Sequence, residues 1–241
     1  MGVTVSIHQP NYLPWPGYFR KIAQSDVFVF FDNVQMPIGK SLVTRNRVKT
    51  AQGTRWLTVP THRDSSGASI AETPIALGNW SRKHLMTLQT AYAGSPALEA
   101  VLDILESALA ADHRTIAALN VDLVVRLSGY VGIDSVRYLR ASEMGLTTEG
   151  GASIPEILEK TGATAYLTGS GAGSMRYLDE ETLAGHGIET LFVDSAFESY
   201  PQRHGNFEPD LSVLDVLLNC GPAQTLTRLR ANAPHGSEKR P

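Results

Sequence analysis

Short apolar runs alternate with amphipathic stretches near both ends of the chain. Close to the start, Val3–Ile7 and Asp26–Phe31 predict two buried strands, and Gly17–Gln24 between them predicts a helix. A strand, a helix and a second strand within about 30 residues form the smallest parallel unit of a sheet. The later part of the chain repeats this alternation, with predicted strands at Val136–Leu139, Ala165–Thr168 and Glu189–Val193 and predicted helices at Ser153–Lys160, Leu178–Ala184 and Leu211–Cys220.

The middle of the chain follows other patterns. Leu42–Val48 and Thr54–Val59 flank a loop that contains glycine, which predicts a β-hairpin, and the small polar residues of Arg63–Ala71 predict a mobile loop. Residues 80–131 keep a helical period throughout. We therefore expect an α/β fold, a Rossmann-like mostly parallel sheet with a β-hairpin and an all-helical insert at about 80–131, in a single domain (1–231) followed by a disordered tail (232–241).

Composition excludes several classes of protein. The chain has 241 residues, 42% of them hydrophobic, which is enough for a sizeable core. No apolar run approaches the ~18 residues of a membrane span, and the first residues lack the pattern of a secretory signal. The single cysteine, Cys220, excludes an internal disulfide framework and a zinc site of several cysteines. We therefore expect a cytoplasmic protein without a membrane partner.

Positive charge is concentrated in one segment. The chain has 21 Lys and Arg against 24 Asp and Glu, yet residues 33–63 include no acidic residue. Alternate residues of a strand share a face, so Arg45, Arg47 and Lys49 are expected to form a cationic row, with Asn46 on the other face. Such a row suits a small anionic ligand, which Arg can bind through two hydrogen bonds. The alternative is a solvated strand face.

The densest polar cluster follows the first predicted strand and contains His8, Gln9, Asn11 and Tyr12. Ligands of open parallel sheets bind beyond the carboxyl ends of the strands. We predict His8 as a general acid or base and Tyr12 as a second catalytic candidate, while Gln9 and Asn11 orient a substrate. The alternative is a structural loop whose polar groups bond to neighbouring main chain.

A glycine-rich segment follows the predicted strand Ala165–Thr168. The N–H groups of Gly169, Ser170 and Gly171 can approach a phosphate or carboxylate closely. The spacing matches neither the dinucleotide fingerprint nor a Walker loop, so an anion site and a tight turn are equal readings. Ser170 is also a candidate nucleophile, although its neighbours do not form a nucleophile elbow.

The remaining candidates lie near the end of the chain. Cys220 ends a predicted helix, where the helix dipole disfavours a thiolate, and we expect it to be a buried structural residue. Asp215 follows Ser212 at the spacing of a capping box, as Glu156 follows Ser153. Gln202 lies in a loop that can approach the site. No spacing of residues indicates a metal ion, and no motif indicates a cofactor.

Together these motifs resemble the WbqC-like protein family. The resemblance covers about residues 3–222 and implies a small cytoplasmic biosynthetic enzyme of surface-polysaccharide or natural-product pathways, whose motif residues line the site, without implying a particular reaction. The motifs that carry it are IHQPNYLPW (7–15), GYF (17–19), DVFVFFD (26–32), Asn46-Arg47 with Lys49, WLTVP (56–60), YLTGSGA (166–172), YLD (177–179), YPQ (200–202) and LSVLDVLLNCG (211–221).

A more distant likeness concerns the first helix. The proline-rich loop that leads into it is similar to that of nucleotidyltransferases with an H-x-G-H motif, whose two histidines bind a triphosphate. Trp15 and Tyr18 stand at these two positions here. Both residues depart from the motif, so the likeness does not carry triphosphate chemistry over to this chain even with a shared fold, and nucleotide binding stays open with Tyr18 as a substrate-binding candidate.

The leading functional prediction is a transferase that acts on a small activated metabolite with an acyl, aminoacyl or nucleotide-linked donor. His8 supplies the acid or base and the cationic row holds the anionic substrate. One alternative is a hydrolase or lyase with Cys220 or Ser170 as nucleophile. Another is a non-catalytic module that binds a carrier-bound intermediate. Candidate partners are a carrier protein or an aminoacyl-tRNA donor.

Overall fold

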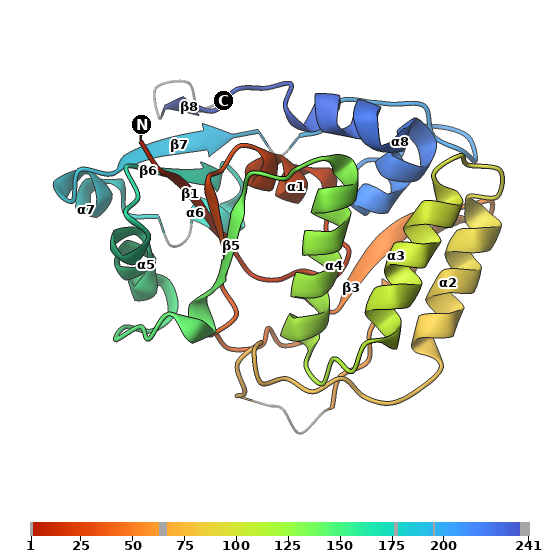
Figure 1. Ribbon diagram of the computed structural model, residues 1–241, viewed down its shortest axis with the longest axis horizontal. Helices are drawn as coiled ribbons and strands as arrows, with labels where there is room; N and C mark the ends of the chain where they lie inside the picture. Colours follow the sequence, from red (N-terminus) through yellow and green to blue (C-terminus); the bar gives the residue numbers. More distant parts are fainter. Residues whose placement is uncertain (1, 63–66, 176–177, 195, 237–241) are drawn as a thin grey trace.

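A six-stranded sheet in the order β5-β2-β1-β6-β7-β8 forms the centre of the protein, and β3 and β4 form a separate antiparallel hairpin (Figure 1). The computed structural model describes residues 2–62, 67–175, 178–194 and 196–236. All neighbouring strands of the sheet run parallel except β7 and β8. The strands are β1 (Thr4–His8), β2 (Val27–Phe30), β3 (Arg45–Thr50), β4 (Gly53–Thr58), β5 (Arg137–Arg140), β6 (Ala165–Gly169), β7 (Glu189–Val193) and β8 (His235–Gly236).

Helices cover both faces of this sheet (Figure 1). α5 and α7 pack on one face, and α1, α4 and α8 pack on the other, with α2 and α3 beyond them. This confirms the predicted α/β fold with a mostly parallel sheet, a hairpin and a helical insert. The helices are α1 (Pro16–Ala23), α2 (Trp80–Ala91), α3 (Leu98–Ala110), α4 (Ile116–Val131), α5 (Ser153–Thr161), α6 (Ala172–Met175), α7 (Glu180–Gly185) and α8 (Val213–Leu229).

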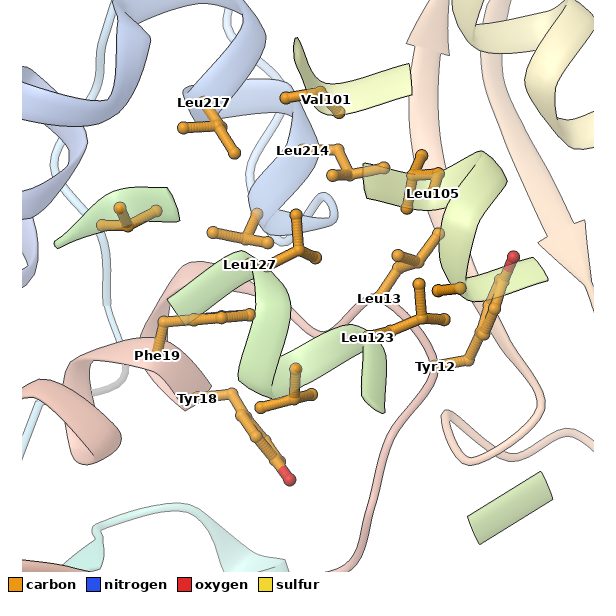
Figure 2. Packing of buried hydrophobic residues seen from close by; sticks show 14 of the residues in the cluster. Tyr12, Leu13, Tyr18, Phe19, Val101, Leu105, Leu123, Leu127, Leu214 and Leu217 are labelled. Atoms are coloured by element: carbon orange, nitrogen blue, oxygen red, sulfur yellow. The ribbon is translucent and has the colours of Figure 1, made fainter. Parts of the chain in front are cut away.

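Alternation along the strands distributes side chains between two cores. Phe28 and Phe30 of β2 join the core under α1 and α4, where Figure 2 shows the tightly packed side chains. Val27 and Val29 belong instead to the core under α5 and α7. This period of two is the reason that a continuous apolar run predicts a strand buried on both faces.

The order of the strands creates a crevice at β1. The chain continues from β1 to β2 on one side, whereas β6 joins β1 on the other side, so the direction of winding reverses between β1 and β6. These two strands pair at Thr4 with Ala165 and at Val5 with Tyr166, near their amino ends. Open α/β sheets bind ligands where the order reverses, outside the carboxyl ends of the strands.

The hairpin has a tighter turn than the sequence predicted. Thr50 pairs with Gly53, so Ala51 and Gln52 alone form the turn, whereas a five-residue loop was expected. Gly53 has a φ of 102°, a conformation that favours glycine. The alternation of the strand agrees with the prediction, because Asn46 and Val48 are buried on the face opposite the arginines.

The C-terminal helix is longer than predicted. Its regular geometry breaks at Gly221, where φ is 78°, but a second helical segment continues to Leu229. Gly221 and Pro222 therefore produce a kink and not the expected stop, because proline is tolerated at the start of the new segment.

Neither expected capping box forms. Ser212 does cap α8, since its Oγ accepts from the Leu214 N–H, but the Asp215 carboxylate bonds to two tyrosines elsewhere. In α5, Ser153 lies inside the helix and donates to the Thr148 carbonyl, while Glu156 accepts from residues 147 and 148. The spacing is present, but tertiary partners compete for the carboxylates.

Two segments expected to be mobile contain ordered residues. In the predicted loop Arg63–Ala71, Ile70 is fully buried and the Ala71 N–H donates to the Asp32 carbonyl, which fixes the second half of the loop; residues 63–66 lie outside the described residues. In the predicted tail 232–241, His235–Gly236 form β8 beside β7, and residues 237–241 lie outside the description.

Candidate functional site

A pocket of about 1280 Å³ opens at the carboxyl ends of β1 and β6. His8 and Gln9 line it from β1, Gly169 and Gly171 from the end of β6, and Arg47 from the hairpin. The pocket thus lies where the winding of the sheet reverses, as parallel sheets favour. Of the residues predicted from the sequence, the structure brings His8, Gln9, Asn46, Arg47, Gly169 and Gly171 to this pocket.

His8 occupies an aromatic corner of the pocket. Its ring lies 4.8 Å from the Tyr18 ring and 5.5 Å from the Trp15 ring, both in edge-on geometry. The Gln9 carbonyl accepts from His8 Nδ1 at 3.0 Å and from the Tyr18 hydroxyl at 3.1 Å. Tyr18 is fully buried and does not line the pocket, so it supports the imidazole and does not present its own hydroxyl to a ligand.

The hydrogen bond to Gln9 defines the tautomer of His8. A carbonyl oxygen only accepts, so Nδ1 must carry a proton, and the neutral ring has a lone pair on Nε2. Burial lowers the pKa of His8 well below its ordinary value, and the positive charge of Lys21 lowers it further. At neutral pH the imidazole is therefore uncharged, with Nε2 able to accept a proton.

Lys21 is a pocket residue that the sequence reasoning missed. It is only 4% exposed, and the described part of the chain gives its ammonium group no hydrogen bond or ion pair. Burial lowers the pKa of Lys21 to about 7. No pattern signalled it, because α1 is buried on all sides and its amphipathic period does not distinguish a pocket residue from a surface one.

The hairpin contributes cations whose positions differ. Arg47 lines the pocket and lies 3.6 Å from the Glu208 carboxylate, and it also donates to the carbonyls of residues 209 and 210. The Arg45 guanidinium stacks 4.0 Å above the Trp56 ring and does not line the pocket. The predicted row is real as a strand face, but only its middle member reaches the pocket.

Lys49 belongs to a different cluster, which joins the hairpin to the loop after residue 200. Its Nζ donates to Gln202 Oε1 at 3.1 Å and to the carbonyls of Gly205 and Asn206. The Gln202 amide in turn donates to the Tyr200 hydroxyl at 3.1 Å. Neither Lys49 nor Gln202 lines the pocket, so their predicted contact with substrate has no support in the geometry.

The same cluster contains Asp215, which is fully buried. The Tyr92 hydroxyl donates to Asp215 Oδ1 at 2.6 Å, and the Tyr200 hydroxyl donates to Oδ2 at 2.8 Å. Burial raises the pKa of Asp215, and the two tyrosine hydroxyls oppose this by stabilising the carboxylate. Asp215 therefore holds α8 to α2 and lies outside the pocket.

Other predicted residues lie in the interior. The Tyr12 side chain is buried in the helical core, where its hydroxyl lies 2.9 Å from His84 Nδ1, and it points in a different direction from Tyr18 (Figure 2). Asn11 is also buried beside it and does not line the pocket. A catalytic role of Tyr12 thus lacks geometric support, because the loop turns away from the pocket after Gln9.

The two candidate nucleophiles also lie outside the pocket. Cys220 is half-buried against the helical core, and burial raises the pKa of its thiol, which reduces the fraction of reactive thiolate. Ser170 lies between two glycines that line the pocket but is not itself a lining residue. Ser174, which sequence reasoning did not select, lines the pocket instead.

The rest of the pocket wall is largely apolar. Val34, Met36, Ile38 and Leu42 come from the segment before the hairpin, and Trp56 comes from β4. Ile38 is 89% exposed, so this wall is open to solvent on its outer side. A pocket with a few polar groups and a largely apolar wall suits a ligand that has a charged group and an apolar part.

Two further features are absent from the described part of the chain. None of the described helices has the length and apolar character needed to cross a membrane. Within the same residues, no three His, Cys, Asp or Glu side chains lie together as a metal site requires.

Comparisons with known proteins identify the family of this chain. A model of the WbqC-like protein family matches residues 9–227. The chain is 32% identical over 220 residues to Uncharacterized protein Rv1507c of Mycobacterium tuberculosis, a match that covers 90% of this chain and 94% of that protein. No solved structure matches the chain. The chain belongs to the WbqC-like protein family, as its motifs indicated.

Proposed function

We propose that this protein is a cytoplasmic biosynthetic transferase that moves a group from a small activated donor to an acceptor in the pocket at the end of β1. The observation that carries this proposal is the geometry of His8. Its Nδ1 proton is held by the Gln9 carbonyl, and no described residue bonds to its Nε2 lone pair, in a pocket large enough for substrates. A positioned imidazole of this kind typically acts as a general base.

The size of the pocket supports transfer between two molecules. Its volume of about 1280 Å³ exceeds the range of roughly 300–1,000 Å³ that is common for single small ligands. A transferase must hold a donor and an acceptor together in reactive geometry, which removes much of the entropic cost of their encounter. The apolar wall at residues 34–42 suits an acyl or aminoacyl donor, carried as a thioester on a carrier protein or as an ester on tRNA.

The chemical step needs one proton acceptor and one anion site. His8 Nε2 takes the proton from an amine or hydroxyl of the acceptor, whose freed electron pair forms the new bond to the transferred group. The bond between that group and the oxygen or sulfur of the donor then breaks, and the imidazolium returns its proton to this leaving group. Arg47 lines the same pocket and adds positive charge on its hairpin side.

The test begins with ligand binding, because no substrate is required in advance. Thermal unfolding is measured with acyl-CoAs, sugar nucleotides, nucleoside triphosphates and amino acids, and a ligand at 100 times its Kd stabilises the folded state by roughly 2.7 kcal/mol. Donor–acceptor pairs built from the stabilising compounds are then assayed for transfer. We expect His8→Ala to lower kcat by roughly 10²–10⁴-fold, the usual contribution of a general base.

Matched variants separate this proposal from its alternatives. Cys220→Ser should leave the rate of transfer unchanged, because Cys220 lies outside the pocket. If Cys220→Ser removes activity while His8→Ala retains it, the protein is a thiol-dependent hydrolase or lyase and the transferase proposal is wrong. A ligand that binds without turnover by any donor–acceptor pair would indicate a binding module.

A further inference from the structure

The strongest unused group in the pocket is the ammonium of Lys21. We propose that Lys21, and not the cationic row of the hairpin, is the principal receptor for the anionic group of the ligand. This rests on the proposed function only in that both use the same pocket. The ligand class is a molecule with a phosphate or carboxylate group that enters beside His8 at the end of β1.

The other cations near the pocket already have partners. Arg47 is occupied by Glu208 and by two carbonyl groups of the following residues. Lys49 Nζ is bound by Gln202 and two carbonyls, and the Arg45 guanidinium stacks on Trp56. These contacts tie the hairpin to neighbouring segments, so an anion would have to compete for each of them.

Lys21 differs in both burial and partners. It is 4% exposed, lines the pocket and has no hydrogen bond or ion pair from its ammonium to any described residue. Gly17 lies one helical turn before it, and both residues line the pocket, so the absence of a side chain at Gly17 leaves room along the face that Lys21 occupies. A buried amine without a partner costs free energy unless something supplies hydrogen bonds and opposite charge.

The described residues that line the pocket include a single carboxylate, that of the exposed Asp210, and burial is the cause of the lowered pKa of Lys21. The titratable side chains that line the same pocket are His8 on β1, Tyr166 on β6, Arg47 on β3 and Asp210 in the segment before α8. On the other side of α1, Arg20 and not Lys21 donates to the carbonyl of Arg228 in α8. His8 and Tyr166 are uncharged near neutral pH, because burial lowers the pKa of His8 and raises that of Tyr166.

An anion beside Lys21 therefore changes its protonation. Burial holds the pKa of Lys21 at about 7, so close to neutrality much of the protein carries an uncharged amine. An opposite charge within a few ångströms favours the ammonium form and raises the pKa. Binding of the anion should consequently take up a fraction of a proton near pH 7.

Calorimetry with minimal anions tests this assignment. Inorganic pyrophosphate and malonate are titrated into the wild-type protein and into Lys21→Met, Arg47→Ala and Lys160→Met, where Lys160 is an exposed lysine that serves as control. We expect Lys21→Met to weaken binding at least 30-fold, Arg47→Ala to weaken it less than five-fold, and Lys160→Met to have no effect. Binding of pyrophosphate alone assigns a phosphate ligand, and binding of malonate alone assigns a carboxylate.

Proton uptake gives a readout that a purely structural role would not change. The binding enthalpy is measured at pH 7 in two buffers of different ionisation enthalpy, and the difference gives the number of protons taken up on binding. The wild-type protein should bind at most about half a proton together with the anion, whereas Lys21→Met should bind none. Equal affinity of wild type and Lys21→Met, or no binding of either anion to wild type, would overturn the assignment. If Lys21→Met loses anion binding but the wild-type protein catalyses no transfer, only the transferase proposal is wrong. If Lys21→Met catalyses transfer at the wild-type rate, only the inference about Lys21 is wrong.

Discussion

Two clusters of polar side chains differ in how far their hydrogen-bonding groups are satisfied. In the Asp215 cluster, each carboxylate oxygen accepts from a tyrosine hydroxyl, and Gln202 links Tyr200 to Lys49. In the pocket, the hydrogen bond of the His8 ring to a described residue comes from Nδ1 alone. The described residues provide no partner for the ammonium of Lys21. A saturated cluster specifies structure, whereas unused groups beside a cavity are available to a ligand.

The sequence motifs favour the Asp215 cluster over the pocket as the place of the binding residues. Lys49, Gln202 and Asp215 stand in family motifs and carry charge or amide groups, so they resemble binding residues. In the structure they connect β3, the loop after residue 200 and α8, with the Tyr200 hydroxyl between Gln202 and Asp215. Lys21, which no motif singled out, faces the cavity. The type of a side chain therefore indicates less well whether it binds a ligand or supports the fold than the number of its hydrogen bonds within the protein does.

The largest expected effect is a gain of stability in Lys21→Met. In the folded protein the pKa of Lys21 is about 7 against an ordinary value of 10.5, so the unfolded chain binds more protons between these values and wild-type stability rises with pH there. Removing the amine should raise the free energy of unfolding at pH 7 by up to roughly 4 kcal/mol. It should also remove the part of the increase in stability with pH that Lys21 causes. Urea denaturation of both proteins at pH 7 and 9 measures the difference; a variant less stable than wild type at pH 7 would contradict the proposed lack of partners.

Asp215→Ala should have the opposite sign. Two buried tyrosine hydroxyls lose their acceptor, and α8 loses its link to α2, so we expect a loss of roughly 3 kcal/mol in the free energy of unfolding. Denaturant titration with wild type as reference checks this value. A loss below about 0.5 kcal/mol would show that the Asp215 cluster is not a structural unit.

Tyr92→Phe is a smaller test within the same cluster. It removes one donor to Asp215 and leaves the Tyr200 hydroxyl in place, so a loss of about 1–2 kcal/mol is expected. In a double-mutant cycle with Asp215→Ala, the two losses should be clearly less than additive because they remove the same hydrogen bond. Additive losses would mean that the two side chains contribute independently.

The smallest effect on stability is expected for His8→Gln. Among the described residues the imidazole has one hydrogen bond, to a neighbouring carbonyl, so the free energy of unfolding should change by less than about 1 kcal/mol. Thermal and urea unfolding measure this change, and transfer activity is assayed in the same preparation. A loss of several kcal/mol would place His8 with the structural cluster and remove the contrast between the two regions.

Local patterns of apolar residues in the sequence determined most of the strands and helices of this protein. The apolar runs that became β1, β2, β6 and β7 need no distant partner to be recognised, because strands buried on both faces are continuously apolar. The helical insert was equally visible, since α2, α3 and α4 each keep an apolar stripe at helical spacing. His8 and Gln9 could be placed at the pocket because they lie at the end of a strand of a parallel sheet, where pockets form.

Tertiary structure alone decided which polar residues face the pocket. Lys21 and Tyr18 occupy the same short helix, yet one lines the cavity and the other is enclosed, because α1 is buried on every side and each face meets a different neighbour. The capping boxes expected after Ser212 and Ser153 did not form for a related reason, since donors from other segments reached the carboxylates of Asp215 and Glu156. A sequence specifies which groups can form hydrogen bonds, but which bonds form depends on the segments that the fold places beside them.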